Sequence, residues 1–243
     1  MKISELFNSI QGEGKRTGYP SFFIRTNFCN LRCKFADGNL CDTAYTSWFP
    51  EDKENIGVMK IPDIIEEYKK YSSPDIVITG GEPAMQAEEL NELCYKLKAF
   101  NKNIFITLET NGTIYDKFAE LIDLISISPK LKSSVPYSTE YEKMHSNNRL
   151  NFDSFKKFHQ GNEKGFFDLQ CKFVICNEND IDEILELQKS IGFKNENIFL
   201  MPEGITNEEI SNKRKMVSEL CMKYKMNYTD RLHILLYGNK RGY

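Results

Sequence analysis

The sequence predicts an α/β fold with parallel strands, arranged either as a barrel or as a doubly wound sheet. Short runs rich in β-branched and aromatic residues alternate with amphipathic helical segments along most of the chain. Strands that alternate with helices pair in parallel, because each crossover helix returns the chain to the same end of the sheet. Polar residues also follow directly after several of these runs, where such folds bind their ligands.

The predicted elements follow one another along the chain. Seven runs are predicted strands: residues 21–26, 75–79, 103–108, 124–128, 169–175, 198–201 and 233–237. Apolar residues at a spacing of about 3.6 predict helices within 62–68, 90–100, 181–187 and 210–224. Residues 129–151 lack such periodicity and are predicted to form a long functional loop. No linker divides the 243 residues, so one domain is expected.

Charge and hydropathy restrict the partners of the chain. Lys plus Arg is 32 and Asp plus Glu is 35, so the formal net charge is −3. This balance is not typical of proteins that bind nucleic acid or anionic membranes. No apolar run reaches the roughly 20 residues that span a bilayer, and the N-terminus shows no apolar leader. We therefore expect a cytoplasmic protein that binds small molecules or other proteins, without a nucleic-acid or membrane partner.

The cysteines indicate a metal site. Cys29, Cys33 and Cys41 lie in one segment, and Asp37-Gly38-Asn39 between them is typical of a turn. A structural zinc site needs four ligands, which Asp37 or Asp42 could complete. A 4Fe–4S cluster on three thiolates instead leaves one iron open, as a catalytic cluster requires. The remaining four cysteines are expected in the core: Cys94, Cys171, Cys176 and Cys221.

Polar motifs follow four of the predicted strands. They are Thr79 to Pro83, Glu109 to Gly112, Ser128 to Lys130 and Met201 to Gly204. Because the carboxyl ends of parallel strands share one edge, we expect these motifs and the cysteine loop to converge there.

These residues resemble the radical S-adenosylmethionine (SAM) superfamily, in which a cysteine loop follows the first barrel strand. Gly80-Gly81-Glu82-Pro83 is similar to that superfamily's motif for the methionine amino group. Within it, the chain resembles the 7-carboxy-7-deazaguanine synthase family through Gln11-Gly12-Glu13-Gly14, Arg25, Cys41-Asp42-Thr43 and the final Gly238 to Tyr243. The resemblance spans nearly the whole chain. It implies a partial (β/α) barrel of the radical SAM type, one core domain over residues 1–243 with N- and C-terminal substrate-binding extensions.

The resemblance also implies a reaction. The family converts 6-carboxy-5,6,7,8-tetrahydropterin to 7-carboxy-7-deazaguanine with loss of ammonia, on the route to queuosine and related 7-deazapurines. The resemblance implies three cofactors: a 4Fe–4S cluster, SAM and Mg²⁺. SAM would be cleaved to a 5′-deoxyadenosyl radical and regenerated. The implied partners are an electron donor such as flavodoxin or ferredoxin and a second copy of the chain in a homodimer.

Site residues carry over from the matching motifs. Cys29, Cys33 and Cys41 would ligate the cluster, and Thr43 would ligate Mg²⁺. Arg25 would pair its planar guanidinium with the substrate carboxylate. The implied substrate contacts are Ile10, Gln11, Gly12, Glu13, Arg25, Thr79 and Tyr243. The implied SAM contacts are Leu40, Asp42, Gly80, Gly81, Glu82, Glu109, Ser128, Pro129, Lys130, Gln170, Cys171, Lys172 and Phe173.

One feature departs from the superfamily pattern. Seven residues, Lys34 to Leu40, separate Cys33 from Cys41, where the superfamily has two, and Leu40 replaces the aromatic residue before the last cysteine. We expect the cluster to be retained, with Phe35 as a candidate to pack on the adenine. Two alternatives remain at this point: another radical SAM enzyme, such as a glycyl-radical activase, and a non-catalytic zinc-binding module.

Overall fold

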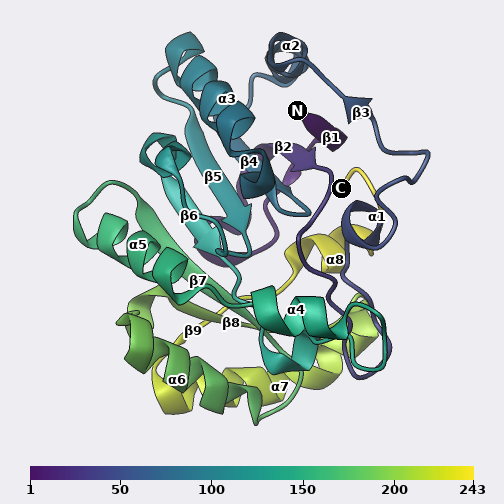
Figure 1. Cartoon of the computed structure of the whole chain (residues 1–243), viewed down its shortest axis with the longest axis vertical. Coiled ribbons are helices and arrows are strands. Elements are labelled where there is room, and N and C mark those ends of the chain that lie inside the picture. Colours follow the sequence, from purple (N-terminus) through teal and green to yellow (C-terminus); the bar gives the residue numbers. More distant parts are fainter.

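A single curved sheet of nine strands forms the centre of the computed structural model, which describes all residues 1–243 (Figure 1). The strands lie in the order β3-β1-β2-β4-β5-β6-β7-β8-β9. Their bounds are β1 Lys2–Ile10, β2 Pro20–Thr26, β3 Gly57–Val58, β4 Asp75–Gly80, β5 Phe105–Thr110, β6 Leu124–Ile127, β7 Asp168–Ile175, β8 Ile198–Pro202 and β9 Asn227–Tyr228. The helices are α1 Ala44–Ser47, α2 Ile61–Tyr71, α3 Ala87–Phe100, α4 Glu142–Asn148, α5 Phe152–Glu163, α6 Asp180–Ile191, α7 Asn207–Tyr224 and α8 Leu232–Tyr237.

Every neighbouring pair from β2 to β9 is parallel. The terminal strands β3 and β9 do not pair with each other, so the sheet curves without closing. This arrangement is a partial barrel, as predicted, and it places the carboxyl ends of β2 and β4 to β8 around one mouth.

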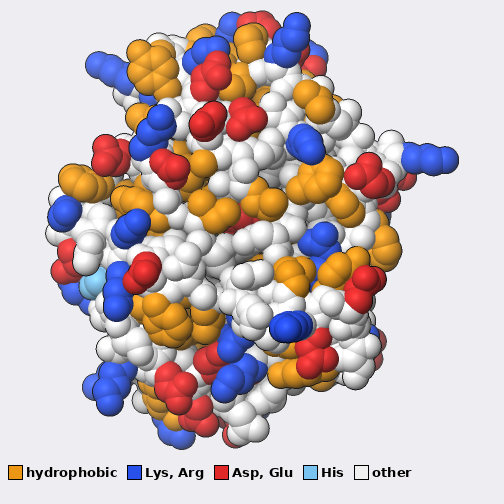
Figure 2. All heavy atoms as spheres, in the orientation of Figure 1, with side chains coloured by type: hydrophobic (Ala, Val, Ile, Leu, Met, Phe, Trp, Pro, Cys, Tyr) orange, Lys and Arg blue, Asp and Glu red, His pale blue; other side chains and the backbone are white.

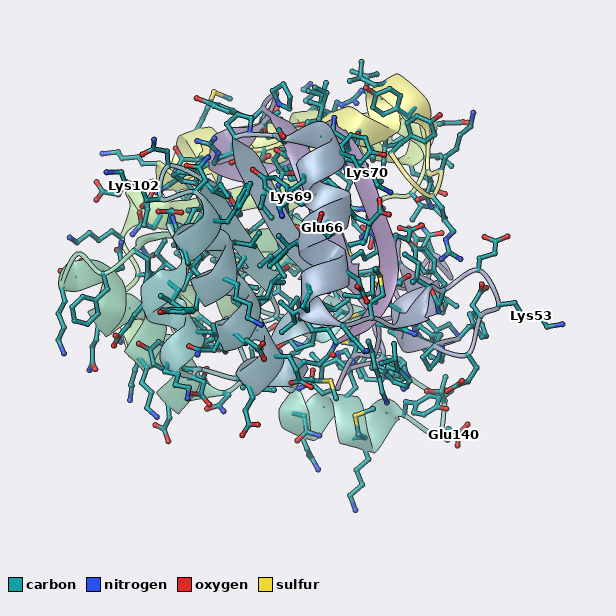
Figure 3. All side chains as sticks on the ribbon, turned by 90° about the horizontal axis from the view of Figure 1, so that it is seen from above. Lys53, Glu66, Lys69, Lys70, Lys102 and Glu140 are labelled. Carbon is teal, nitrogen blue, oxygen red and sulfur yellow. The ribbon has the colours of Figure 1, made fainter.

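The outer helices bury the convex face of the sheet. In α3 the residues Leu90, Leu93, Cys94 and Leu97 are buried at helical spacing and join the main hydrophobic core. In α2 the opposite face is charged: Glu66, Lys69 and Lys70 point outward, and Lys69 pairs with Glu66 at 2.6 Å (Figure 3). On the face seen in Figure 2, basic and acidic side chains are interspersed, in keeping with the near-neutral net charge.

The prediction of a strand at residues 233–237 was wrong, because this segment is helix α8. A short apolar run does not distinguish a strand from one buried helical turn. Ile234 is buried while Leu235 and Leu236 are exposed, which is a one-sided helical pattern. The strand that completes the sheet is the two-residue β9, which is too short to produce a clear sequence signal.

Two further segments differ from expectation. β1 was not predicted, although it pairs antiparallel with β2 and its Phe7 ring stacks on Phe23 at 4.9 Å. Residues 129–151 are not wholly loop, since they contain the short helix α4. No helix of the structure is long and apolar enough to cross a membrane.

Candidate active site

A cavity of about 380 Å³ lies at the carboxyl ends of the parallel strands. Its wall combines the loop after β1, the cysteine segment after β2, the ends of β4 to β8, and the C-terminal tail beyond α8. Thus segments from both ends of the chain meet over the mouth of the partial barrel, where such folds carry out their chemistry.

The seven residues between Cys33 and Cys41 form a small hairpin. Lys34 bridges Leu40, the Phe35 N–H donates to the Asn39 carbonyl at 2.8 Å, and the Cys41 N–H donates to the Cys33 carbonyl at 3.2 Å. The hairpin therefore brings Cys33 and Cys41 side by side despite their separation in sequence. Cys29, Cys33 and Cys41 are all free thiols and all line the cavity, as do Phe35 and Leu40.

Polar contacts fasten the tip of this hairpin to the far side of the mouth. Asn39 donates to the Glu203 carboxylate at 3.1 Å, and Asp37 pairs with Lys213 at 3.1 Å. Lys213 also pairs with Glu203, whose side chain is almost fully buried just after β8. The hairpin thus spans the mouth from the end of β2 to β8 and α7.

We expect Lys213→Met to loosen the cysteine hairpin and destabilise the protein. The substitution would leave the buried Glu203 carboxylate without its cation, at a cost of about 1–3 kcal/mol in the free energy of unfolding. Chemical denaturation of the protein without metal measures this cost. Lys215→Met is the matched control, because Lys215 is 88% exposed on the same helix. Equal effects of the two substitutions would contradict the anchoring role of Lys213.

The cysteine thiols are suited to a multinuclear cluster. Burial raises the pKa of Cys29 to about 12 and also raises the pKa of Cys33 and of Cys41. The thiols are therefore neutral unless a bound metal stabilises the thiolates. No three His, Cys, Asp or Glu side chains converge closely enough to ligate one metal ion. Three free thiols on one cavity wall are the ligand set of a 4Fe–4S cluster that keeps one iron open.

Gly80 and Gly81 bring the end of β4 against the backbone that leads into the cysteine segment. Gly80 has a φ of 131°, and a Cβ there would lie 2.2 Å from the Thr26 carbonyl oxygen. A Cβ at Gly81 would lie 2.1 Å from the Phe28 carbonyl oxygen. Only glycine permits these approaches, so the two residues place their backbone on the cavity wall beside Cys29.

The Glu82 side chain does not line the cavity. It is fully buried and accepts hydrogen bonds from the Thr110 hydroxyl at 2.7 Å, the Asn111 N–H at 2.6 Å and the Ala84 N–H at 3.0 Å. These donors occupy the carboxylate that was expected to accept from the SAM ammonium. In this structure Glu82 joins the ends of β4 and β5.

A group of charged side chains lines the cavity and includes Asp42, which directly follows Cys41. Lys172 forms salt bridges to Glu13 and, at 3.3 Å, to Glu109, while Arg231 pairs with Asp42 at 2.9 Å. Burial raises the pKa of Glu13, but the charges of Lys172 and Arg231 outweigh it and bring that pKa to about 2. The Glu13 carboxyl group is therefore ionised at neutral pH.

Glu109 connects this charged group to predicted substrate contacts. The Thr79 hydroxyl donates to its carboxylate at 2.9 Å, and the Gln11 side-chain amide donates to it at 3.4 Å. Glu109 was expected to contact SAM, yet its partners Gln11 and Thr79 were expected to contact substrate. The structure therefore places Glu109 among the predicted substrate contacts.

Arg25 reaches the cavity with part of its guanidinium free. Its Nε donates to Glu5 at 2.8 Å, and its two terminal nitrogens donate to no protein atom. Arg25 and Glu5 are directly opposite each other in the β1–β2 ladder, which explains the pairing. The free side of the fork remains available to an anionic ligand.

Comparisons with known proteins agree with this geometry. A family model described as the radical SAM superfamily matches residues 23–217. The chain is 37% identical to a 7-carboxy-7-deazaguanine synthase of Halobacterium salinarum, covering 98% of this chain and 91% of that protein. It is 36% identical to the enzyme of the same name from Rhodopirellula baltica, covering 99% and 88%. The chain belongs to the 7-carboxy-7-deazaguanine synthase family.

A solved structure shows the same fold. QueE from Escherichia coli superposes with a TM-score of 0.68 at 21% identity, covering 96% of this chain and 94% of that chain. Together these similarities confirm the predicted family, the partial radical SAM barrel and the class of enzyme, a radical SAM lyase. Membership in the superfamily implies a 4Fe–4S cluster and SAM as cofactors.

Most residues expected from the family motifs line the one cavity. They are Ile10, Gln11, Gly12, Glu13, Arg25, Cys29, Cys33, Leu40, Cys41, Asp42, Thr43, Thr79, Gly80, Gly81, Glu109, Ser128, Lys130, Lys172 and Tyr243. Besides Glu82, four expected SAM contacts are not on its wall: Pro129, Gln170, Cys171 and Phe173.

The alternation of side chains along β7 explains two of these four, and local hydrogen bonds explain Gln170. Cys171 and Phe173 point into the hydrophobic core, whereas Lys172 between them faces the cavity. Gln170 is on the same face as Lys172, but it is buried against Ser126 and the backbone N–H of Lys15. Any contribution of Cys171 or Phe173 to a ligand would have to come from the backbone.

Several residues of the wall were not predicted from the sequence. Glu5, Tyr45, Arg231, His233 and Arg241 all lie in or beside the cavity. His233 was missed because it was placed in the mistaken strand at residues 233–237, and Arg231 belongs to no sequence motif. A Cβ on Gly12 would lie 2.1 Å from the His233 ring, so this helix packs directly on the Gln-Gly-Glu-Gly motif.

Proposed function

We propose that this cavity converts 6-carboxy-5,6,7,8-tetrahydropterin to 7-carboxy-7-deazaguanine, with release of one molecule of ammonia and no net oxidation, in the pathway to queuosine. The observation that carries the proposal is the meeting of the three cysteines, the Gly80-Gly81 backbone and the free side of Arg25 on one cavity wall. A radical source and a site for an anionic heterocycle are thereby adjacent.

The protein residues bind and orient the two ligands. Cys29, Cys33 and Cys41 would hold the cluster, which together with SAM supplies a carbon radical that removes a hydrogen atom from the substrate. The Gly80 and Gly81 backbone, Ser128 and Lys130 would hold SAM. Arg25 would bind the substrate carboxylate, and the other substrate contacts would bind the pterin ring: Ile10, Gln11, Gly12, Glu13, Thr79, Glu109 and Tyr243.

The hairpin would supply the apolar part of the SAM site. Leu40 and Phe35 line the cavity from the hairpin, and Met201 lines it from the end of β8. These side chains could enclose a flat adenine between them, which supports Phe35 as the replacement for the usual aromatic residue. The C-terminal tail also lines the cavity, which favours a small-molecule substrate over the protein loop that a glycyl-radical activase must admit.

Turnover by the reconstituted protein tests the proposal directly. The full chain would be reconstituted anaerobically with iron and sulfide, then incubated with the pterin, SAM, Mg²⁺ and a reductant. We expect 7-carboxy-7-deazaguanine and an equal amount of ammonia, measured by mass spectrometry and an ammonia assay. A protein that cleaves SAM but leaves the pterin unchanged would contradict the substrate assignment.

Magnesium belongs to the proposal, with Thr43 as its ligand. Thr43 lines the cavity at the start of α1, its side chain caps no backbone N–H, and its hydroxyl lies 3.4 Å from the Cys41 sulfur. An oxygen donor that reaches a cavity next to a substrate carboxylate suits Mg²⁺, which keeps several water ligands.

In Thr43→Ala we expect the Mg²⁺ concentration that gives half-maximal stimulation of product formation to rise roughly tenfold. The cluster content should stay unchanged. The loss is partial because water and substrate oxygens remain as ligands. Titration of Mg²⁺ against product formation measures it, with Thr46→Ala, a buried threonine of the same short helix, as control. Wild-type Mg²⁺ dependence in Thr43→Ala would remove Thr43 from the site.

The remaining partners are also proposed from the family. A flavodoxin or ferredoxin would supply electrons to the cluster, and the protein would act as a homodimer. Sedimentation of the full chain and reduction of the cluster by each purified donor test these two points.

A further inference from the structure

The carboxylate of Glu5 is shared between two arginines that come from opposite ends of the chain. Its Oε2 accepts from Arg25 Nε at 2.8 Å and from the Tyr45 hydroxyl at 3.0 Å. Its Oε1 accepts from Arg241 Nε at 2.8 Å. The Glu5 side chain is only 11% exposed, so both oxygens are held by protein donors in a largely dry environment.

The two arginines use their remaining nitrogens differently. Arg241 contacts Asp52 and Glu54, each at 3.2 Å, and the Asn55 side chain at 3.1 Å. Arg25 has no further protein partner for its terminal nitrogens, and it lines the cavity. Hence the Arg241 guanidinium is fully paired with protein groups, whereas the terminal nitrogens of Arg25 are free to bind a ligand. Glu5 contacts both arginines.

Arg241 also belongs to the tail that covers the cavity. After α8 the chain has little regular backbone hydrogen bonding, with one bond from the Lys240 N–H to the Gly238 carbonyl. The Arg241 guanidinium lies 4.0 Å from the centre of the Tyr45 ring, and the Tyr243 ring packs on Tyr237 at 5.1 Å. Side-chain contacts, rather than secondary structure, therefore hold the tail in place.

We propose that Glu5 is a positioning residue that couples closure of the C-terminal tail to the orientation of Arg25, and so to recognition of the substrate carboxylate. The inference rests on the proposed function, because it takes Arg25 as the group that binds that carboxylate. Without Glu5, the Arg25 and Arg241 guanidiniums would lose the negative charge that they share, and the Arg25 fork would lose its anchor at Nε. Both the tail and the substrate site would then loosen together.

The experiment compares Glu5→Gln with Asp52→Asn in the reconstituted full chain. Glutamine preserves the shape of Glu5 but removes the charge that attracts both arginines. The Asp52→Asn substitution would weaken a contact of Arg241 alone, because Asp52 does not contact Arg25. The measurements are KM and kcat with 6-carboxytetrahydropterin, inhibition by tetrahydropterin without the carboxylate, and amide hydrogen exchange of residues 238–243.

For Glu5→Gln we expect KM for the carboxylated substrate to rise roughly 10- to 100-fold, with a smaller change in kcat and faster amide exchange in the tail. Binding of the pterin without the carboxylate should change little. Asp52→Asn leaves both contacts between Glu5 and the arginines in place, so it should change tail exchange and KM for the carboxylated pterin much less than Glu5→Gln does. Arg241→Met, as a second variant that retains Glu5, should speed exchange and raise KM several-fold.

Three outcomes would overturn the inference: Glu5→Gln with unchanged tail exchange, equal loss of both pterins in that variant, or Arg241→Met with fast exchange and an unchanged KM. Product formation by the wild-type protein distinguishes a failure of this inference from a failure of the proposed function. If the wild type makes no product from 6-carboxytetrahydropterin, the function is refuted. If the wild type makes product and any of the three outcomes is observed, only the role of Glu5 is refuted.

Discussion

Replacement of Cys29, Cys33 or Cys41 by alanine is expected to abolish both stable 4Fe–4S binding and turnover. The three thiols line one cavity and have no disulfide partner. Each would hold a different iron, so the two that remain cannot complete the cluster. Iron and sulfide content, the visible spectrum and product formation after anaerobic reconstitution measure the loss. It should exceed the loss of activity caused by Arg25→Ala, Thr43→Ala or Lys213→Met.

Cys94→Ala is the matched control. Cys94 is fully buried in α3 within the hydrophobic core, so its loss tests stability without touching the cavity. We expect a normal cluster in this variant. Wild-type cluster content in any of the three cavity variants, or zinc in place of iron in the wild type, would disprove the ligand assignment.

Arg25→Ala is expected to weaken binding of the carboxylated pterin by about 2–5 kcal/mol, or roughly two to three orders of magnitude in affinity. The Arg25→Ala substitution would not leave the Glu5 carboxylate without a hydrogen-bond partner. That carboxylate keeps its contacts with Arg241 and Tyr45. The loss should therefore report the ligand interaction more than damage to the fold. KM for 6-carboxytetrahydropterin measures it.

A pterin without the carboxylate provides the comparison for Arg25. It should bind the wild type poorly and respond little to Arg25→Ala, so that the difference isolates the coupling between arginine and carboxylate. Arg25→Lys should restore only part of the affinity, since lysine lacks the planar fork. Equal losses for both ligands would show that Arg25 supports the cavity wall instead of binding the carboxylate.

Much of the site could be predicted because its motifs are local. The cysteines lie within 13 consecutive residues, from Cys29 to Cys41, and Gly80-Gly81 follows directly after a predicted strand. Strand ends of a parallel sheet meet at one edge, so local motifs that follow strands also meet there. For the same reason, most residues named from the family resemblance line a single cavity.

The motifs alone do not predict which way a side chain points. Cys171 and Phe173 stand in a motif-matching stretch, but strand alternation directs them into the core. Glu82 belongs to a recognised motif, yet its carboxylate accepts hydrogen bonds from Thr110 and Asn111 at the end of the neighbouring strand. Helix α8 was mistaken for a strand because its short apolar run fits either period.

By itself, the sequence determined the class of fold, the cysteine cluster, the glycine pair and the family, since each is written in residue types and short spacings. Only the tertiary structure decided which charges pair across the cavity: Glu5 with Arg241, 236 positions apart, and Asp42 with Arg231, 189 positions apart. Burying an unpaired charge costs free energy, so each of these groups pairs with the opposite charge that the fold places next to it. These pairings cannot be predicted from periodicity along the chain, because the paired residues come together only when the two ends of the chain meet over the barrel mouth.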